Sequence, residues 1–168
     1  LYGLEYRDEA VRLQVPIELD DQLIEHLSIP ANLYLIGTMN STDRSLAMID
    51  YALRRRFYFW RLMPTEAGRA PVLQRWLAAQ PGVSASTRAQ LHAAFVGLNR
   101  SIAQQLGDDY KIGHSYFMLG SEEIGDPAAL QRVWRHAIEP LLREYFHTRP
   151  NVGSLIEKLR VSFFQEPA

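Results

Sequence analysis

Residues 32–57 read NLYLIGTMNSTDRSLAMIDYALRRRF, and this stretch decides the fold. Its first part, residues 32–39, is a nearly continuous apolar run, which is typical of a strand buried on both faces in a parallel sheet. The polar cluster from Asn40 to Ser45 predicts a loop, and the residues from Leu46 to Arg55 predict a helix. A buried strand, a polar loop and a helix in this order indicate an α/β layer.

The flanking segments extend this pattern. Alternation of apolar and polar residues over 10–15 predicts a short strand or hairpin arm, and residues 20–27 predict one or two helical turns. The aromatic run over residues 57–62 predicts a second strand. We therefore expect residues 1–63 to form the end of an α/β subdomain.

The rest of the chain, residues 64–168, has the spacing of helices. Gly107 is expected to stop one helix, Asp126 and Pro127 to begin another, and Pro140 to bend it. The predicted fold class is α/β followed by all-α. The expected helices cover residues 65–79, 87–106, 127–145 and 154–160.

Composition excludes several classes of protein. The 168 residues are 47% hydrophobic, carry a formal net charge of −1 and contain no cysteine. Disorder, disulfide scaffolds and thiolate metal sites are therefore excluded, and no global charge favours nucleic acid or an anionic membrane. Because no membrane span and no signal peptide are recognisable, we expect a cytoplasmic protein with no membrane partner.

The chain contains no phosphate-binding loop of the G-x-x-x-x-G-K-[ST] type. Such a loop needs a lysine that follows a glycine. The two lysines are Lys111, which follows Tyr110, and Lys158, which follows Glu157. The chain therefore cannot hold a triphosphate through a loop of this kind.

The loop after the predicted strand carries the residues best suited to chemistry. In open α/β sheets the ligand lies beyond the carboxyl ends of the strands, where Asn40 and Asp43 are expected. An asparagine amide can orient a water molecule without taking its proton. The arginines at positions 54–56 point in different directions around a helix end, so at least one should project outward.

Structural roles are an alternative for each of these residues. Asn40 and Asp43 could instead cap the following helix, and the three arginines could form a solvated helix end that pairs with Asp50. Residues 40–43 also match the loose N-x-x-D pattern with which small GTP-binding proteins recognise guanine, but this four-residue pattern has little specificity.

Several blocks of the chain together resemble a known family. They are similar to the second half of the motor domain in the McrB-type branch of AAA+ nucleoside triphosphatases, which supplies the GTP-hydrolysing subunit of modified-cytosine-dependent DNA restriction. The resemblance implies the C-terminal portion of an AAA+ parallel-sheet domain followed by its helical lid. The matching blocks are residues 32–40, 42–47, 50–57, 112–118 and 138–146, which lie in the family's order and at similar spacing.

The resemblance also implies roles for single residues. Asn40 matches the sensor-1 asparagine, which orients the attacking water or contacts the γ-phosphate, and Asp43 matches the acidic residue of the same loop. Arg55 and Arg56 match arginines at the subunit interface, one of which acts as an arginine finger on the neighbour's nucleotide. Residues assigned to nucleotide binding or to the interface on weaker grounds are Arg44, Arg54, Lys111 and His114.

The complete protein implied by this resemblance contains more than the present chain. It would bind GTP or ATP with Mg²⁺, assemble into a ring, usually a hexamer, and act with a nuclease subunit on DNA. The phosphate-binding loop, the magnesium-binding Asp-Glu strand and any DNA-reading domain precede Leu1 in the family pattern. We therefore expect this chain to be inactive alone and to bind neither nucleotide nor metal tightly.

Two other functions remain as alternatives. The first is a non-catalytic assembly or nucleic-acid-binding module on the same fold, with the arginines on phosphates and the aromatic run of residues 57–60 stacked on bases. The second, a histidine-based metal hydrolase, is disfavoured because the histidines form no H-x-x-x-H pair. His114 and Tyr116 could likewise be packing residues that anchor a turn.

Overall fold

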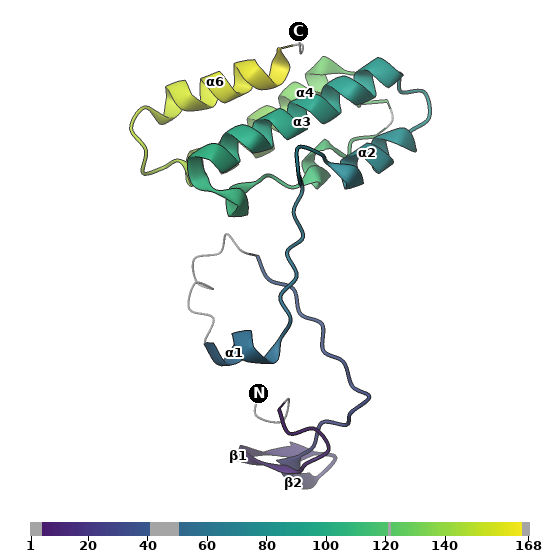
Figure 1. Cartoon of the computed structure of the whole chain (residues 1–168), viewed down its shortest axis with the longest axis vertical. Coiled ribbons are helices and arrows are strands. Elements are labelled where there is room, and N and C mark those ends of the chain that lie inside the picture. The colour runs from purple at the N-terminus through teal and green to yellow at the C-terminus, as the bar shows by residue number, and fades with distance from the viewer. Residues whose placement is uncertain (1–4, 41–50, 121, 166–168) are drawn as a thin grey trace. The chain divides into compact units, whose positions relative to one another are not determined.

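A computed structural model describes residues 5–40, 51–120 and 122–165 of the chain (Figure 1). The chain divides into an N-terminal unit, Leu1–Arg61, and a helical unit, Leu62–Ala168. Within the part of the chain that the structure describes, no helix is both long and apolar enough to cross a membrane.

The N-terminal unit contains a two-stranded antiparallel hairpin, β1 (Val11–Leu19) and β2 (Gln22–Leu27). The predicted strand at residues 10–15 is confirmed and extends to Leu19, but the helical turns predicted at 20–27 are wrong. Leu19 pairs with Gln22, so Asp20 and Asp21 form a two-residue turn, and both have positive φ angles, 50° and 56°. Aspartate tolerates this left-handed conformation, and such turns match the twist of the strands that they join.

The two strands predicted at residues 32–39 and 57–62 do not form. Residues 32–40 are exposed and have no regular structure; Ile36 is 95% exposed and Trp60 is 87% exposed. A parallel strand exists only where neighbours accept its backbone hydrogen bonds and cover its faces. Among the described residues, the hairpin forms a sheet of two strands only, so these apolar segments have no strand beside them.

The start of the first extended segment is nevertheless held in place. The guanidinium of Arg7 donates to the carbonyl oxygen of Leu33 at 2.6 Å, and the backbone N–H of Ala31 donates to Asp8 Oδ1 at 3.1 Å. These bonds tie residues 31–33 to the chain ahead of the hairpin.

Helix α1 (Tyr51–Arg56) lies within the region where a helix is predicted at residues 46–55. The first part of that prediction, residues 46–50, lies outside the described residues. All three arginines, Arg54, Arg55 and Arg56, fall in the last turn of α1. Cations at this end complement the negative end of the helix dipole.

The helical unit contains five α-helices within its described residues (Figure 1). The predicted helix ends at Gly107 and Asp126 are confirmed: Gly107 ends one helix with a φ angle of 101°, and Asp126 accepts hydrogen bonds from the first turn of the next. The helix predicted over residues 65–79 is wrong at its start and begins only at Pro71, because Glu66 and Arg69 exchange backbone hydrogen bonds in a turn. The C-terminal helix is longer than the predicted residues 154–160. The helices are α2 (Pro71–Ala78), α3 (Ala85–Leu106), α4 (Pro127–Val133), α5 (Glu139–Tyr145) and α6 (Val152–Phe164).

A π-helical segment, Trp134–Ile138, separates α4 from α5 where the sequence predicts one bent helix. Pro140 explains the interruption. It has no backbone N–H, and its ring would collide with the carbonyl group of His136 in a regular helix. The wider π turn relieves this collision and keeps Trp134 and Ile138 in the core.

Side chains of α3 hold both ends of the short helix α2. His92 Nε2 accepts a hydrogen bond from the backbone N–H of Ala70 at 3.2 Å, just before α2 begins. Arg88 donates to the carbonyl oxygen of Gln80 at 3.0 Å, just after α2 ends. These two contacts satisfy backbone groups of the residues that flank α2 and so fix both ends of the helix against α3.

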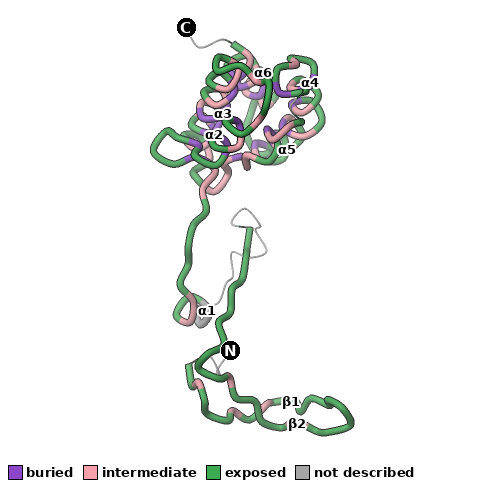
Figure 2. The backbone as a smooth tube through the Cα atoms, turned by 90° about the vertical axis from the view of Figure 1, so that its right-hand side faces the viewer, coloured by how far each residue is buried: buried purple, intermediate pink, exposed green. Residues whose placement is uncertain are grey.

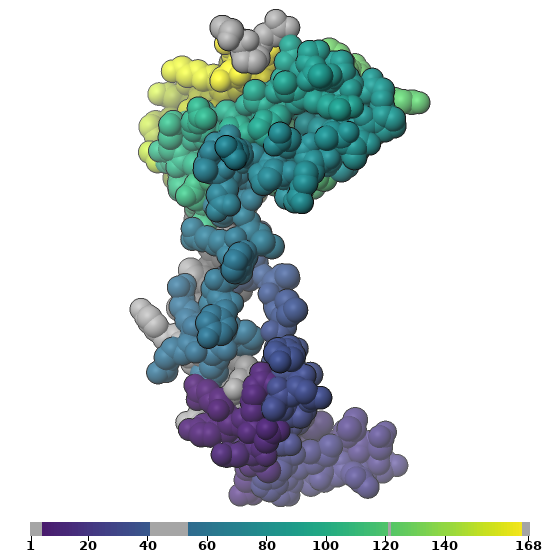
Figure 3. Space-filling view, turned by 45° about the vertical axis from the view of Figure 1, so that its right-hand side comes forward, coloured from purple at the N-terminus to yellow at the C-terminus, as the bar shows by residue number. Residues whose placement is uncertain are grey.

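Buried residues gather in the helical unit, as the colouring of Figure 2 shows. Figure 3 shows one face of the same unit in space-filling form. Phe95 on α3 is fully buried and packs edge-to-face on Phe117, with ring centroids 5.0 Å apart. Trp134 and Phe163 pack together with centroids 5.3 Å apart. This aromatic core joins α3, α6 and the segment between α3 and α4.

Candidate functional site

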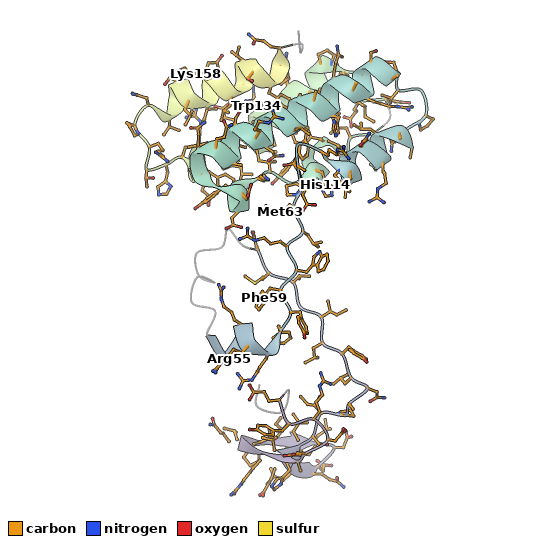
Figure 4. All side chains as sticks on the ribbon, viewed as in Figure 1. Arg55, Phe59, Met63, His114, Trp134 and Lys158 are labelled. Atoms are coloured by element: carbon orange, nitrogen blue, oxygen red, sulfur yellow. The ribbon has the colours of Figure 1, made fainter. Side chains whose placement is uncertain are left out.

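The three arginines at the end of α1, residues 54–56, differ in exposure. Arg54 and Arg55 are exposed and make no ion pair with any described residue; Figure 4 labels Arg55. Arg56 instead pairs with Glu5 at 3.1 Å, and its side chain is only 8% exposed. Arg55 therefore presents a planar cationic fork to solvent, whereas Arg56 attaches α1 to the start of the chain.

The loop predicted to meet the substrate is described only at its beginning. Asn40 follows the extended segment and is exposed. Asp43 and Arg44 lie outside the described residues. The structure therefore shows only that Asn40 is exposed, and the roles expected for Asn40, Asp43 and Arg44 stay predictions.

Lys111 and His114 lie in the helical unit, in the segment between α3 and α4. Figure 4 labels His114. Lys111 Nζ pairs with Asp108 Oδ1 at 2.7 Å and donates to the carbonyl oxygen of Thr65 at 3.1 Å, and its side chain is 13% exposed. These contacts fix the ammonium group beside the turn that precedes α2.

His114 begins a short 3₁₀ turn, His114–Phe117, and is half-buried. Its Nδ1 atom is buried and finds no hydrogen-bond partner among the described residues. Phe117, rather than Tyr116, anchors this turn in the core: Phe117 is 1% exposed and Tyr116 is 38% exposed. A packing role for Tyr116 in this turn is therefore wrong, while the role of His114 stays a prediction.

Asn99 was missed by the sequence analysis and holds this segment in position. The residue is completely buried on α3. Its Nδ2 donates to the carbonyl oxygen of Ile112 at 3.1 Å, and its Oδ1 accepts from the backbone N–H of Ile112 at 2.6 Å. The signal was present in the sequence, because Asn99 is the one amide among the apolar positions Leu91, Phe95, Leu98 and Ile102.

We expect Asn99→Ala to destabilise the helical unit by about 2–4 kcal/mol, because both backbone groups of Ile112 would be left buried without partners. Urea unfolding of the 168-residue chain measures this. Gln90→Ala, an exposed amide on the same helix, is the matched control and should change stability by less than about 0.5 kcal/mol. Equal effects of the two substitutions would contradict this role for Asn99.

The candidate residues thus belong to two separately described units. Asn40 and the arginines lie in the N-terminal unit, and Lys111 and His114 in the helical unit. Within each unit the structure brings together Arg56 with Glu5, and Lys111 with Asp108 and Thr65. The described parts of the chain contain no group of three or more histidine and acidic side chains that could hold a metal ion.

Comparison with known proteins identifies the class of the helical unit. Residues 90–152 match the sequence family described as "McrB, alpha-helical lid domain". These residues run from α3 through the Lys111–Phe117 segment, α4 and α5 to the start of α6. The helical unit therefore contains a lid domain of the McrB type.

A longer match extends the relationship to most of the chain. Over 155 residues the chain is 35% identical to the "Type IV methyl-directed restriction enzyme EcoKMcrB subunit" of Escherichia coli strain K12. The match covers 88% of this chain and 32% of that protein, so the chain spans about a third of its relative's length. The chain belongs to the McrB family and corresponds to its C-terminal region.

Proposed function

We propose that the chain is part of the nucleoside triphosphatase motor of an McrB-type restriction system. It would contribute the sensor asparagine Asn40, the loop residues Asp43 and Arg44, the interface arginines and the helical lid. The observation that carries this proposal is the 35% identity to a restriction-enzyme subunit over 88% of the chain. The exposed fork of Arg55 adds support, since an arginine that serves a neighbouring subunit must be accessible.

The phosphates and Mg²⁺ would be held mainly by parts of the complete protein outside this chain. The sequence contains no phosphate-binding loop, and the described residues offer no acidic cluster for a metal ion. The match covers only 32% of the relative, which leaves ample length for both elements. The nucleotide would be GTP or ATP, and the Mg²⁺ bound with it would neutralise charge on the phosphates.

Within that motor, Arg55 would act on the nucleotide of the adjacent subunit. A finger arginine neutralises charge that spreads over the γ-phosphate oxygens in the transition state. Arg56, with its ion pair to Glu5, would orient α1, and Arg54 would contact the interface. The active site would then exist only between neighbours in a ring, for which we propose a hexamer that works with a nuclease subunit on DNA.

The exposed apolar segments fit the same proposal. Residues 32–39 and 57–62 would be strands of a parallel AAA+ sheet whose other strands lie elsewhere in the complete protein. Burial of Ile36 and Trp60 in that sheet would remove large apolar surfaces from water. We place the sheet portion in residues 1–63 and the lid in residues 64–168. We also assign Lys111 and His114 to the side of the lid that covers the nucleotide.

Hydrolysis assays on two proteins test the proposal. The complete protein should hydrolyse GTP or ATP in the presence of Mg²⁺, whereas the 168-residue chain should show no turnover above background. Robust turnover by the 168 residues alone would contradict the division of roles.

A non-catalytic nucleic-acid-binding module is the second candidate, and one observation favours it. Tyr58 is fully exposed and Trp60 is 87% exposed, close in sequence to the arginine cluster. Aromatic rings beside cations are suited to stacking on bases. Salt-dependent DNA binding that is lost in an Arg55→Ala, Arg56→Ala double variant, with hydrolysis by the complete protein intact, would favour this candidate.

A further inference from the structure

A hollow in the helical unit has the size of a small-molecule site. Its volume is about 310 Å³, at the lower end of the ~300–1,000 Å³ range typical of ligand pockets. The turn before α2, the second half of α3 and the segment after α3 form its walls. The polar residues and the glycine that line it are Thr65, Gly68, Arg100, Gln104, Asp108 and Lys111.

The cations of the hollow are not fully neutralised. Lys111 is paired with Asp108 at 2.7 Å, so this pair contributes little net charge. Arg100 is exposed and makes no ion pair or hydrogen bond with any residue in the described part of the chain. One full positive charge therefore remains on the wall of the hollow.

The surrounding sequence keeps this region positive. Residues 66–111 contain four arginines and one lysine against three acidic residues, Glu66, Asp108 and Asp109, which leaves a net charge of +2. An anion would therefore be attracted to this side of the unit.

The turn before α2 comes close to the Arg100 guanidinium. Glu66 and Arg69 exchange backbone hydrogen bonds of 2.8 and 2.9 Å, and Ala67 and Gly68 between them have positive φ angles of 47° and 73°. A Cβ atom added at Gly68 would lie 3.7 Å from the Arg100 guanidinium. The guanidinium therefore lies against a turn that has no side chain at its nearest point.

We propose that this hollow binds an oxyanion of the phosphate class, with Arg100 as its principal ligand and Lys111 and Gln104 as additional donors. Guanidinium and ammonium groups are the side chains that proteins use most for phosphate, and a guanidinium binds two of its oxygens at once. The proposal deepens the proposed function, which assigns Lys111 to the nucleotide side of the lid. Phosphate binding within the helical unit is measured without hydrolysis, so the two proposals can fail separately. The phosphate group can come from free phosphate or from a nucleotide.

NMR titration of the 168-residue chain tests the proposal. Inorganic phosphate is added at constant ionic strength, with sodium chloride as the balancing salt, while the amide signals of Thr65, Gly68 and Gln104 are followed. We expect saturable shifts at these amides and at least a tenfold weaker apparent affinity in Arg100→Gln. Lys158→Gln, which removes an exposed cation from α6, should leave the affinity within about twofold.

Two further arms complete the experiment. Titration with GTP and with ATP identifies the source of the phosphate group. The site binds a nucleotide phosphate if the shifts saturate at a lower nucleotide concentration than with inorganic phosphate and if Arg100→Gln abolishes them. Arg100→Lys should bind with intermediate affinity, because it keeps the charge but loses the fork. Shifts that do not saturate with any of these anions, or an Arg100→Gln variant that behaves like Lys158→Gln, would overturn the proposal.

Discussion

Arg55→Ala in the complete protein should slow nucleoside triphosphate hydrolysis by about 10³- to 10⁵-fold, which is the range measured for arginine fingers. The physical reason is that the guanidinium stabilises charge that develops on the γ-phosphate only in the transition state. Nucleotide affinity should therefore change far less than the rate. Single-turnover hydrolysis, combined with equilibrium binding of a nucleotide analogue, separates the two quantities.

Control variants distinguish the loss of an arginine finger from the loss of any positive charge. Arg135→Ala removes an exposed arginine from the helical unit and should leave the rate within about twofold.

Arg56→Ala should also slow hydrolysis strongly. If Arg56 acts by anchoring α1 through its 3.1 Å ion pair, Glu5→Gln should reproduce part of that loss. Equal losses of affinity and rate in Arg55→Ala would mean that Arg55 binds the ground state instead.

Asn40→Ala should lower kcat of the complete protein by about 10²- to 10³-fold, the loss typical of removing one oriented hydrogen-bonding group from a catalytic site. The amide would orient the attacking water or contact the γ-phosphate, and alanine can do neither. Steady-state hydrolysis and nucleotide binding measure the effect. Gln90→Ala, which removes an exposed amide from α3, is the control. An unchanged kcat in Asn40→Ala would exclude a sensor role for this residue.

The helical unit could be predicted from sequence because its determinants are local. Asp126 with Pro127 begins α4, Gly107 ends α3, and apolar residues such as Phe95 recur at helical spacing. These signals depend on neighbours a few residues away, so they persist in any context. The interruption of the helix near Pro140 is also a local effect. The structure accommodates it with a π-helical segment instead of the predicted bend in one continuous helix.

The N-terminal unit could be predicted only in part because its strands depend on distant partners. The apolar run of residues 32–39 has the composition of a buried strand, but composition alone cannot provide the neighbouring strands. The turn at Asp20 and Asp21 was missed because two aspartates resemble a helix start as much as a hairpin turn. Among the candidate site residues, the anchoring of Arg56 by Glu5 depends on a contact across 51 residues of sequence.

The central claim is that Asn40 and Arg55 serve one active site from two different subunits, and mixing two inactive variants tests it most directly. Asn40→Ala and Arg55→Ala forms of the complete protein are combined in equal amounts and allowed to exchange subunits before hydrolysis is measured. In a randomly mixed ring, about a quarter of the interfaces would pair an intact Asn40 with an intact Arg55 from the neighbour, so activity should recover to about a quarter of wild type. No recovery, with mixed rings verified by differently tagged subunits, would contradict the claim, because it would mean that both residues act within the same subunit.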